Sequence, residues 1–502
     1  MKQNLILGLL VAFFIFTTAP AFASEADLMT AIQNLQGQMR QMQGVIDMQN
    51  QRLSQLEKRE VAVQIAGPAG QGQGEAGSVM TEKEYNDRLN KSLGGANKWL
   101  QGLVFKADSR LRYEAFDYHS GAPNSTPDRN RFRMRLRFGF EKTFNPEIKV
   151  GFGLASGEKT TTNGLQADPT SQNQTMNNDF DFKSIWIEKI FATYTPEWAK
   201  VGPIAGLNIT AGKFDNPFEK GSTDMIWSRT VKPEGAYEMV DLNLYKGDRL
   251  NVKAYGTMGQ FVLRETGTYT TATSGALKDS ELFAYQVGLN PSFQTDFVKK
   301  PIELLSALSL YSYPGYANYN NWRIGNTTVA PTTTGQSLAN GNIISEGNAA
   351  NLDAMHFNVI NVYQELALYP HGIPVRPFAE WANNLSDSSG SIRDAADAWS
   401  LGLKVGKVQK KGDLEAGYAY KWIGANSVVG AFNDNDFGSA TYGGTGRRGS
   451  VIKLGYGLTD NVTLNGSAYL VNALNTGYSN ANNGAILDEE IRRFQLDVNW
   501  KF

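Results

Sequence analysis

The chain has 502 residues, no cysteine, 51 glycines and a formal net charge of −1. The lack of cysteine excludes disulfides, cysteine-linked lipid anchors and cysteine-ligated haem or metal sites. The near-neutral charge argues against nucleic acid as a partner, and the polar mean hydropathy argues against a bundle of membrane-spanning helices.

The first segment, residues 1–23, is predicted to be a signal peptide. Lys2 precedes a single apolar run, and Ala21-Phe22-Ala23 has the small-x-small form of a cleavage site. The mature chain, beginning at Ser24, is therefore expected to be exported.

A coiled coil is predicted over residues 24–60. Its apolar residues recur at alternating spacings of four and three, which favours a heptad seam over the alternative, a single amphipathic helix packed on the barrel that is predicted below. The predicted core positions are Leu28, Ile32, Leu35, Met39, Met42, Ile46, Gln49, Leu53 and Leu56. Since Met and Gln are mixed with Ile and Leu, the seam predicts self-association without fixing the number of chains.

Two short segments are predicted to follow the coil. Residues 61–80 are rich in Gly, Gln and Ala with no regular period, which predicts a flexible linker. Residues 81–100 are compatible with a short helix. We expect this helix to lie just before the next domain.

Residues 101–502 are predicted to form an all-β transmembrane antiparallel β-barrel, because stretches of about ten residues with alternating polarity recur to the end of the chain. The clearest stretch places Arg131, Arg133, Arg135 and Arg137 on one face and apolar residues on the other. An arginine facing lipid near the bilayer midplane costs about 2–4 kcal/mol. Four of them would cancel a typical domain stability of about 5–15 kcal/mol, so these arginines are expected to face a wet lumen.

About sixteen strands are predicted, with fourteen or eighteen as alternatives. They are residues 103–115, 130–141, 147–157, 183–195, 205–213, 236–246, 250–264, 281–290, 303–313, 355–369, 375–384, 396–407, 412–422, 448–458, 461–471 and 491–502. Short and long connections alternate, as periplasmic turns and extracellular loops do in such barrels. An even count would place both barrel ends, and the coil, in the periplasm.

The candidate pore-lining residues are Arg110, Arg112, Arg131, Arg133, Arg135 and Arg137. The third long loop is predicted to fold inward and to set Asp215, Glu219 and Asp224 against these arginines, which would create a transverse field in a narrow opening. In the alternative interpretation, the loop acids are solvated outside and the arginines pair in the wall with Asp108, Glu114 and Glu141.

Several motifs resemble those of one known family. Arg110, Arg112 and Glu114 fit its first-strand Arg-x-Arg-Tyr-Glu pattern, and Gly212-Lys213 with Asn216-Pro217-Phe218 fits its Gly-Lys…Asn-Pro-Phe entry to the third loop. The chain thus resembles, over about residues 97 to 502, the bacterial outer-membrane "putative porin" family, in which an export signal and a coiled-coil segment precede the barrel. The segment 188–191 departs from the expected Arg-Ala-Tyr pattern. The resemblance implies a trimeric diffusion channel of about sixteen strands.

Together these features predict an outer-membrane channel for passive diffusion of small hydrophilic solutes and ions, favouring anions through its arginines. One alternative is a structural tether of the outer membrane through the coil, and another is a channel specific for sugars or anions. We expect no enzyme activity, catalytic residue, cofactor or metal site. The chain has three histidines, His119 in the first loop, His356 at a strand start and His371 in a periplasmic turn, and these are interpreted as surface or interfacial residues. An energised outer-membrane receptor would need a folded plug domain ahead of the barrel, and the sequence of residues 24–100 indicates mostly coiled coil and linker instead.

The expected partners are outer-membrane lipids, the barrel assembly machinery and, as the resemblance implies, two further copies of the chain. The last strand alternates between an outward apolar row and an inward polar row. The outward row is Phe494, Leu496, Val498, Trp500 and Phe502. A terminal aromatic such as Phe502 is typical of barrels that the outer-membrane assembly machinery inserts.

Overall fold

The computed structural model describes residues 102–120, 128–159, 168–177, 179–265, 279–296, 300–316, 337–339, 342–345, 356–386, 395–438, 444–474 and 489–502. The predicted signal peptide, coiled coil, linker and short helix, all within residues 1–100, lie outside these described residues. Everything described belongs to one compact unit, Lys91–Phe502. No helix in the described ranges is long and apolar enough to cross a membrane.

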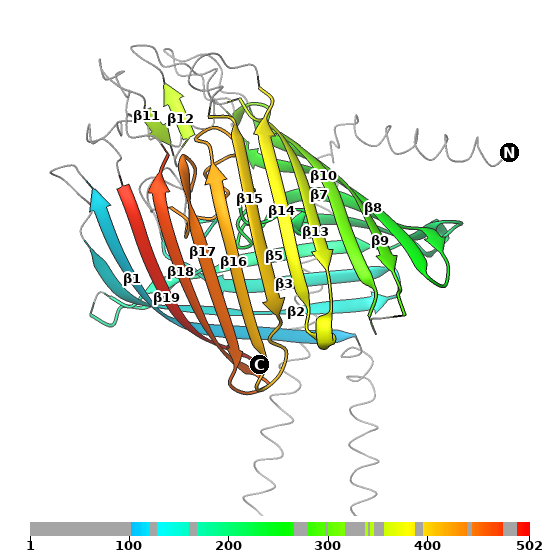
Figure 1. Ribbon diagram of the computed structural model, residues 1–502, viewed down its shortest axis with the longest axis horizontal. Helices are drawn as coiled ribbons and strands as arrows, with labels where there is room; N and C mark the ends of the chain where they lie inside the picture. The colour runs from blue at the N-terminus through cyan, green and yellow to red at the C-terminus, as the bar shows by residue number, and fades with distance from the viewer. Residues whose placement is uncertain are drawn as a thin grey trace, which may run out of the picture. The chain divides into compact units, whose positions relative to one another are not determined.

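Sixteen antiparallel strands close into a barrel (Figure 1). They are β1 (Leu103–Ser120), β2 (Arg129–Asn145), β3 (Ile148–Ser156), β5 (Ile185–Tyr194), β6 (Ile204–Lys213), β7 (Glu234–Lys246), β8 (Leu250–Arg264), β9 (Ser280–Phe293), β10 (Ile302–Ser312), β13 (Asn358–Ala367), β14 (Val375–Asn384), β15 (Asp397–Gly406), β16 (Leu414–Ile423), β17 (Arg447–Gly457), β18 (Val462–Ala473) and β19 (Glu489–Lys501). Each strand pairs with the next along the chain, and β19 pairs with β1. The predicted sixteen strands are confirmed, and the alternatives of fourteen and eighteen are wrong.

Three further short strands lie outside this ladder of sixteen. β4 (Gln174–Thr175) belongs to the loop between β3 and β5 and pairs with Arg133 and Met134 of β2. β11 (Ser337–Ala339) and β12 (Asn342–Ser345) form a separate hairpin between β10 and β13. Long loops therefore carry structure of their own at one rim.

The short connections gather at the opposite rim. In the turn between β2 and β3, the Asn145 side-chain oxygen accepts hydrogen bonds from the backbone N–H groups of Glu147 and Ile148, at 2.9 and 2.8 Å. An Asn can stabilise a tight turn in this way because its side chain mimics a backbone acceptor. The C-terminus lies at the same rim in Figure 1, where Phe502 donates its backbone N–H to the Ala107 carbonyl at 3.0 Å.

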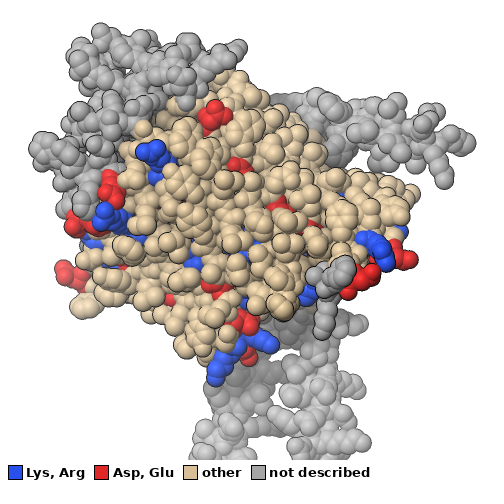
Figure 2. All heavy atoms as spheres, in the orientation of Figure 1, with Lys and Arg blue, Asp and Glu red and all other residues tan. Residues whose placement is uncertain are grey.

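The two faces of the wall have opposite character. On β2, Phe132, Leu136 and Phe138 are exposed on the outside, whereas the intervening Arg133 is buried inside. The outer surface visible in Figure 2 is mainly uncharged. This alternation suits a barrel that crosses a membrane, because apolar side chains contact lipid and charged side chains are solvated in the lumen.

The loop of residues 214–233, between β6 and β7, folds into the barrel and builds an apolar core there. Phe218, Met225 and Trp227 are buried, and their surroundings include Phe261 of β8 and Tyr311 of β10. The loop is also tied to the wall by hydrogen bonds. The Gln286 amide donates to the Phe218 carbonyl at 3.0 Å, and the backbone N–H of Thr223 donates to Glu380 at 2.9 Å.

We predict that F218A loosens this loop without unfolding the barrel. Truncating a buried Phe typically costs about 3–5 kcal/mol, and the lost packing falls on the loop rather than on the strand ladder. Limited proteolysis of the reconstituted protein should cleave F218A within residues 214–233 at least tenfold faster than the wild type. The matched control is F132A, whose side chain faces outward. Equal cleavage of both variants would contradict the loop core.

Candidate functional site

The six candidate pore arginines form a ladder on the inner wall of β1 and β2. The strand register places Arg110 opposite Arg135 and Arg112 opposite Arg133. At the next inward-facing pair in each direction along the strands, a carboxylate lies opposite an arginine; we call each such pair of facing residues a rung. Asp108 lies opposite Arg137, and Glu114 lies opposite Arg131. Because paired residues share a face of the sheet, all eight side chains project into the lumen.

Each of the six ladder arginines has a carboxylate partner in the wall. Asp108 accepts from Arg135 at 2.7 Å and from Arg137 at 2.8 Å. Glu114 accepts from Arg131 at 2.6 Å. Arg112 donates through two nitrogens to Asp497 of β19, at 2.7 and 2.8 Å.

The wall-pairing interpretation thus describes Asp108 and Glu114 correctly. It is wrong for Glu141, which lies 2.7 Å from Lys106 and 3.9 Å from Lys149 rather than beside an arginine.

The ladder is graded in its exposure. The Arg137 side chain is 32% exposed, whereas the Arg112 side chain is only 5% exposed. Loops that fold inward cover the ladder arginines that lie farther from the short-turn rim than Arg137. Arg110 donates to the Asn173 side chain, and Arg133 donates to the Asn173 carbonyl at 3.3 Å. Solutes in the lumen therefore meet Arg137 more readily than Arg112.

The expected opposition between the third-loop acids and these arginines is not found. Asp215 lies 2.9 Å from Lys189 and 2.7 Å from Lys232. Glu219 lies 3.1 Å from Arg229, within the same loop.

Asp224 also pairs with lysines, 2.6 Å from Lys421 and 3.5 Å from Lys453. The physical reason is that the apolar core of the loop docks on β8 and β10, so its acids meet the wall at β5, β16 and β17.

One loop acid that does meet the ladder is Asp436, which the sequence reasoning missed. It belongs to the loop of residues 424–446, between β16 and β17, and lies 3.4 Å from Arg112 and 2.8 Å from Arg493. Burial raises the pKa of Asp436, but the two guanidinium charges outweigh burial and hold it well below its ordinary value. The only available signal was the acidic run around Asp434 and Asp436, which also suits a solvated loop.

The two inward loops are joined through β16. The Lys421 ammonium lies between Asp224 of the first loop and Asp434 of the second, at 2.6 and 3.4 Å. Two backbone bonds reinforce the junction: Asp434 donates to Asp224 at 3.0 Å, and Ser228 donates to Phe432 at 2.6 Å. The opening of the channel is therefore shaped by two loops acting as one body.

The segment that departs from the family pattern lies on β5. Its Lys189 and Phe191 share the inner face with Gly153 and Gly151 of β3. A bulge shifts Glu188, which accepts from the Gln172 amide at 2.7 Å. The inner face of this segment thus contributes one lysine and one aromatic ring.

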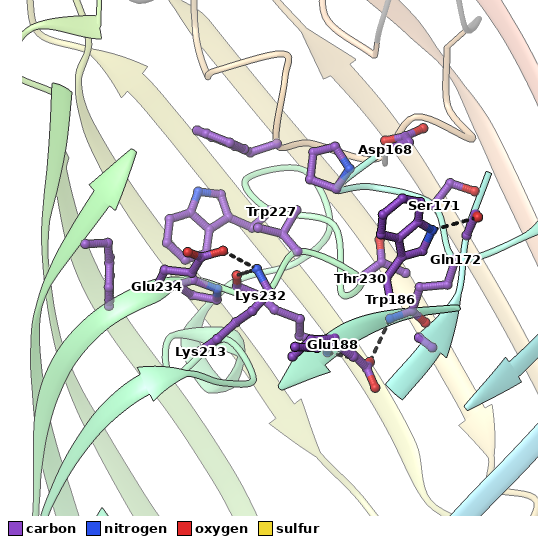
Figure 3. Close-up of a pocket in the computed structure, with 18 of the residues that line it drawn as sticks. Asp168, Ser171, Gln172, Trp186, Glu188, Lys213, Trp227, Thr230, Lys232 and Glu234 are labelled. Carbon is purple, nitrogen blue, oxygen red and sulfur yellow. Dashed lines mark hydrogen bonds and ion pairs between the residues drawn. The ribbon is translucent and has the colours of Figure 1, made fainter. Parts of the chain in front are cut away.

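A cavity of about 320 Å³ lies beside this segment (Figure 3). Trp186 and Glu188 of β5 line one side, and Lys213 and Glu234 line the other. Trp227 of the inward loop lies between them. Among the described residues, no group of three or more His, Asp or Glu side chains could hold a metal ion.

Comparison with known proteins gives a family and similar structures. The profile of the "putative porin" family matches residues 110–355 and 348–502. The high-pH structure of Pseudomonas putida OprB is similar at 12% identity and a TM-score of 0.43, over 82% of this chain and 97% of that chain. Salmonella typhi OmpF in complex with daunomycin is similar at 11% identity and a TM-score of 0.39, over 80% and 97% of the two chains. A search of curated proteins found no match.

We predict that Asp215 stays ionised in mildly acidic solution. Burial raises its pKa, but Lys232 and Lys189 outweigh burial and lower it to about 2. Because the folded-state value is depressed, the contribution of Asp215 to stability is fully present above its usual pKa of about 3.9 and is lost as the pH falls through about 2. The difference in melting temperature between the wild type and D215N should therefore be constant from pH 8 to 5 and shrink toward pH 2. A difference that vanishes already at pH 5 would contradict this assignment.

Proposed function

We propose that the arginine ladder makes this chain, which belongs to the "putative porin" family and forms an outer-membrane channel for passive diffusion, favour small anions. One observation carries the proposal. In the described part of the lumen wall and its loops, the arginine cluster is richer in cations than in carboxylates. Seven arginines, Arg110, Arg112, Arg131, Arg133, Arg135, Arg137 and Arg493, share five carboxylates, Asp108, Glu114, Glu158, Asp436 and Asp497.

The position of the apolar core leaves a path for ions beside the arginine ladder. Phe218 and Trp227 occupy the side of the lumen next to β8 and β10, so that side offers little room for water. Hydrated ions would then pass along the opposite wall, beside Arg135 and Arg137. A net positive wall raises the local concentration of anions and lowers that of cations.

The parts of the chain outside the described residues complete the proposal. β1 begins and β19 ends at the rim of the short turns, which in such barrels is periplasmic. Residues 1–23 would be removed on export, and the coil of residues 24–60, followed by the linker 61–80 and the helix 81–100, would lie in the periplasm. The coil would hold three copies together, and the terminal Phe502 would be recognised by the assembly machinery.

We predict opposite changes in ion selectivity for the two signs of ladder charge. Removing positive charge in R135A/R137A should reduce the permeability ratio of chloride to potassium several-fold, because these rungs face the path. D108N removes the carboxylate that both arginines share and should raise the same ratio. Reversal potentials of single channels in a potassium chloride gradient measure both effects.

The matched control is R249A, in a short turn where the arginine side chain is exposed beside Asp296. It should leave the reversal potential within error of the wild type. If R135A/R137A and D108N shift the reversal potential in the same direction, or not at all, the ladder does not set selectivity.

A further inference from the structure

Two of the ladder arginines, Arg110 and Arg133, have no carboxylate at hydrogen-bond distance among the described residues. Arg110 lies 3.7 Å from Asp497, and Arg133 lies 3.8 Å from both Glu114 and Glu158. The other four ladder arginines lie 2.6–2.8 Å from a carboxylate oxygen. The charges of Arg110 and Arg133 are therefore the least closely balanced in the ladder.

One neutral residue binds both of these arginines. Arg110 donates to the side-chain oxygen of Asn173, and Arg133 donates to the Asn173 backbone carbonyl at 3.3 Å. A carboxylate in the same place could accept two parallel bonds from a guanidinium, the strong arrangement that Arg112 and Asp497 form. Pairing strength alone would thus favour an acid at position 173. Asn173 instead holds the arginines without cancelling their charge.

Asn173 belongs to a buried segment that carries no charge. Residues 170–175, Thr-Ser-Gln-Asn-Gln-Thr, have only hydroxyl and amide side chains, and we call them the collar. The collar lies in the loop between β3 and β5 and ends in β4, which pairs with β2 at Arg133 and Met134. All of its residues except Ser171 are buried. The collar therefore contacts the ladder with groups that form hydrogen bonds but add no charge.

The collar has anchors other than the arginines. The Thr230 hydroxyl donates to the Thr170 carbonyl at 2.6 Å, and the Asn435 amide donates to the Thr170 hydroxyl at 2.9 Å. The Gln172 amide donates to Glu188 at 2.7 Å (Figure 3). These contacts tie the collar to both inward loops and to β5. We therefore expect it to keep its position when the Asn173 side chain is changed.

We propose that Asn173 is a positioning residue that sets the strength of the anion preference, because it fixes Arg110 and Arg133 and leaves their charge uncancelled. The inference rests on the anion preference proposed above. In the described part of the wall and its loops, seven arginines and five carboxylates give the cluster an excess of two positive charges. An acid at position 173 would be a sixth carboxylate and would halve this excess.

The first experiment measures reversal potentials of single channels in a potassium chloride gradient. N173D keeps the shape of the side chain and adds a carboxylate beside two guanidinium groups, where it stays ionised. The variant should lower the permeability ratio of chloride to potassium about threefold, because the wall loses half of its excess positive charge. The matched control is N177D, which adds the same charge to the same loop at an exposed position beside Lys183. It should leave the ratio within error of the wild type.

N173A separates the charge at position 173 from the structure of the collar. This variant removes the acceptor of Arg110 but adds no charge, so its permeability ratio should equal or exceed that of the wild type. A merely structural role for Asn173 predicts instead that N173A and N173D change the ratio alike. That result, or an N173D ratio equal to the N177D ratio, would overturn the inference.

A double variant tests the charge balance itself. D436N removes the carboxylate that lies 3.4 Å from Arg112, so N173D/D436N has as many carboxylates around the ladder as the wild type. Its permeability ratio should return most of the way to the wild-type value. A ratio as low as that of N173D alone would show that the number of charges is not what matters, and would overturn the inference.

The same recordings separate a failure of the inference from a failure of the proposed function. A wild type that favours chloride, with an N173D variant that favours it equally, would overturn the inference and leave the anion preference standing. A wild type that favours potassium would contradict the anion preference. In that case a ratio still lower in N173D than in N177D would support the role of Asn173.

Discussion

Charge is costly where it faces lipid, and the rest of this barrel follows from that constraint. Four arginines alternate with apolar residues along β2, and only one orientation of the strand is affordable when each misplaced arginine costs about 2–4 kcal/mol. Within that orientation, the register with β1 brings Arg110 opposite Arg135 and Arg112 opposite Arg133. The neighbouring carboxylates, Asp108 and Glu114 among them, are then drawn into the same wall, where they hold the guanidinium groups in place.

Two loops that fold into the lumen shape the channel together with the wall. One loop fills the side of the lumen at β8 and β10 with aromatic rings, and a second reaches the ladder through Asp436. Lys421 joins the two loops by binding Asp224 and Asp434. Removing one partner of such a buried group typically costs about 3–5 kcal/mol, so the junction is expected to be rigid. The opening of the channel is thereby set by tertiary contacts between loops and wall, in addition to the barrel itself.

The strands were predictable from sequence because a period of two is imposed locally by the membrane. All sixteen appear where the alternation indicated, with ends that differ by a few residues. The ion-pair partners of the charged loop residues were not predictable, because they depend on the strands against which the apolar loop residues pack. Phe218 and Trp227 dock on β8 and β10, so Asp215 and Asp224 meet lysines rather than the ladder. The contact of Asp436 with Arg112 was not predictable either, because nothing in the sequence around Asp436 distinguishes it from a solvated acid in a surface loop.

The central claim is that the arginine face of β2 borders an aqueous path while the alternate face meets lipid. The absence of cysteine allows a direct measurement on R137C and F138C, adjacent residues on opposite faces. A charged, membrane-impermeant thiol reagent applied to open single channels should lower the current of R137C in discrete steps and leave F138C unchanged. Rapid modification of F138C, with R137C inert, would contradict the account.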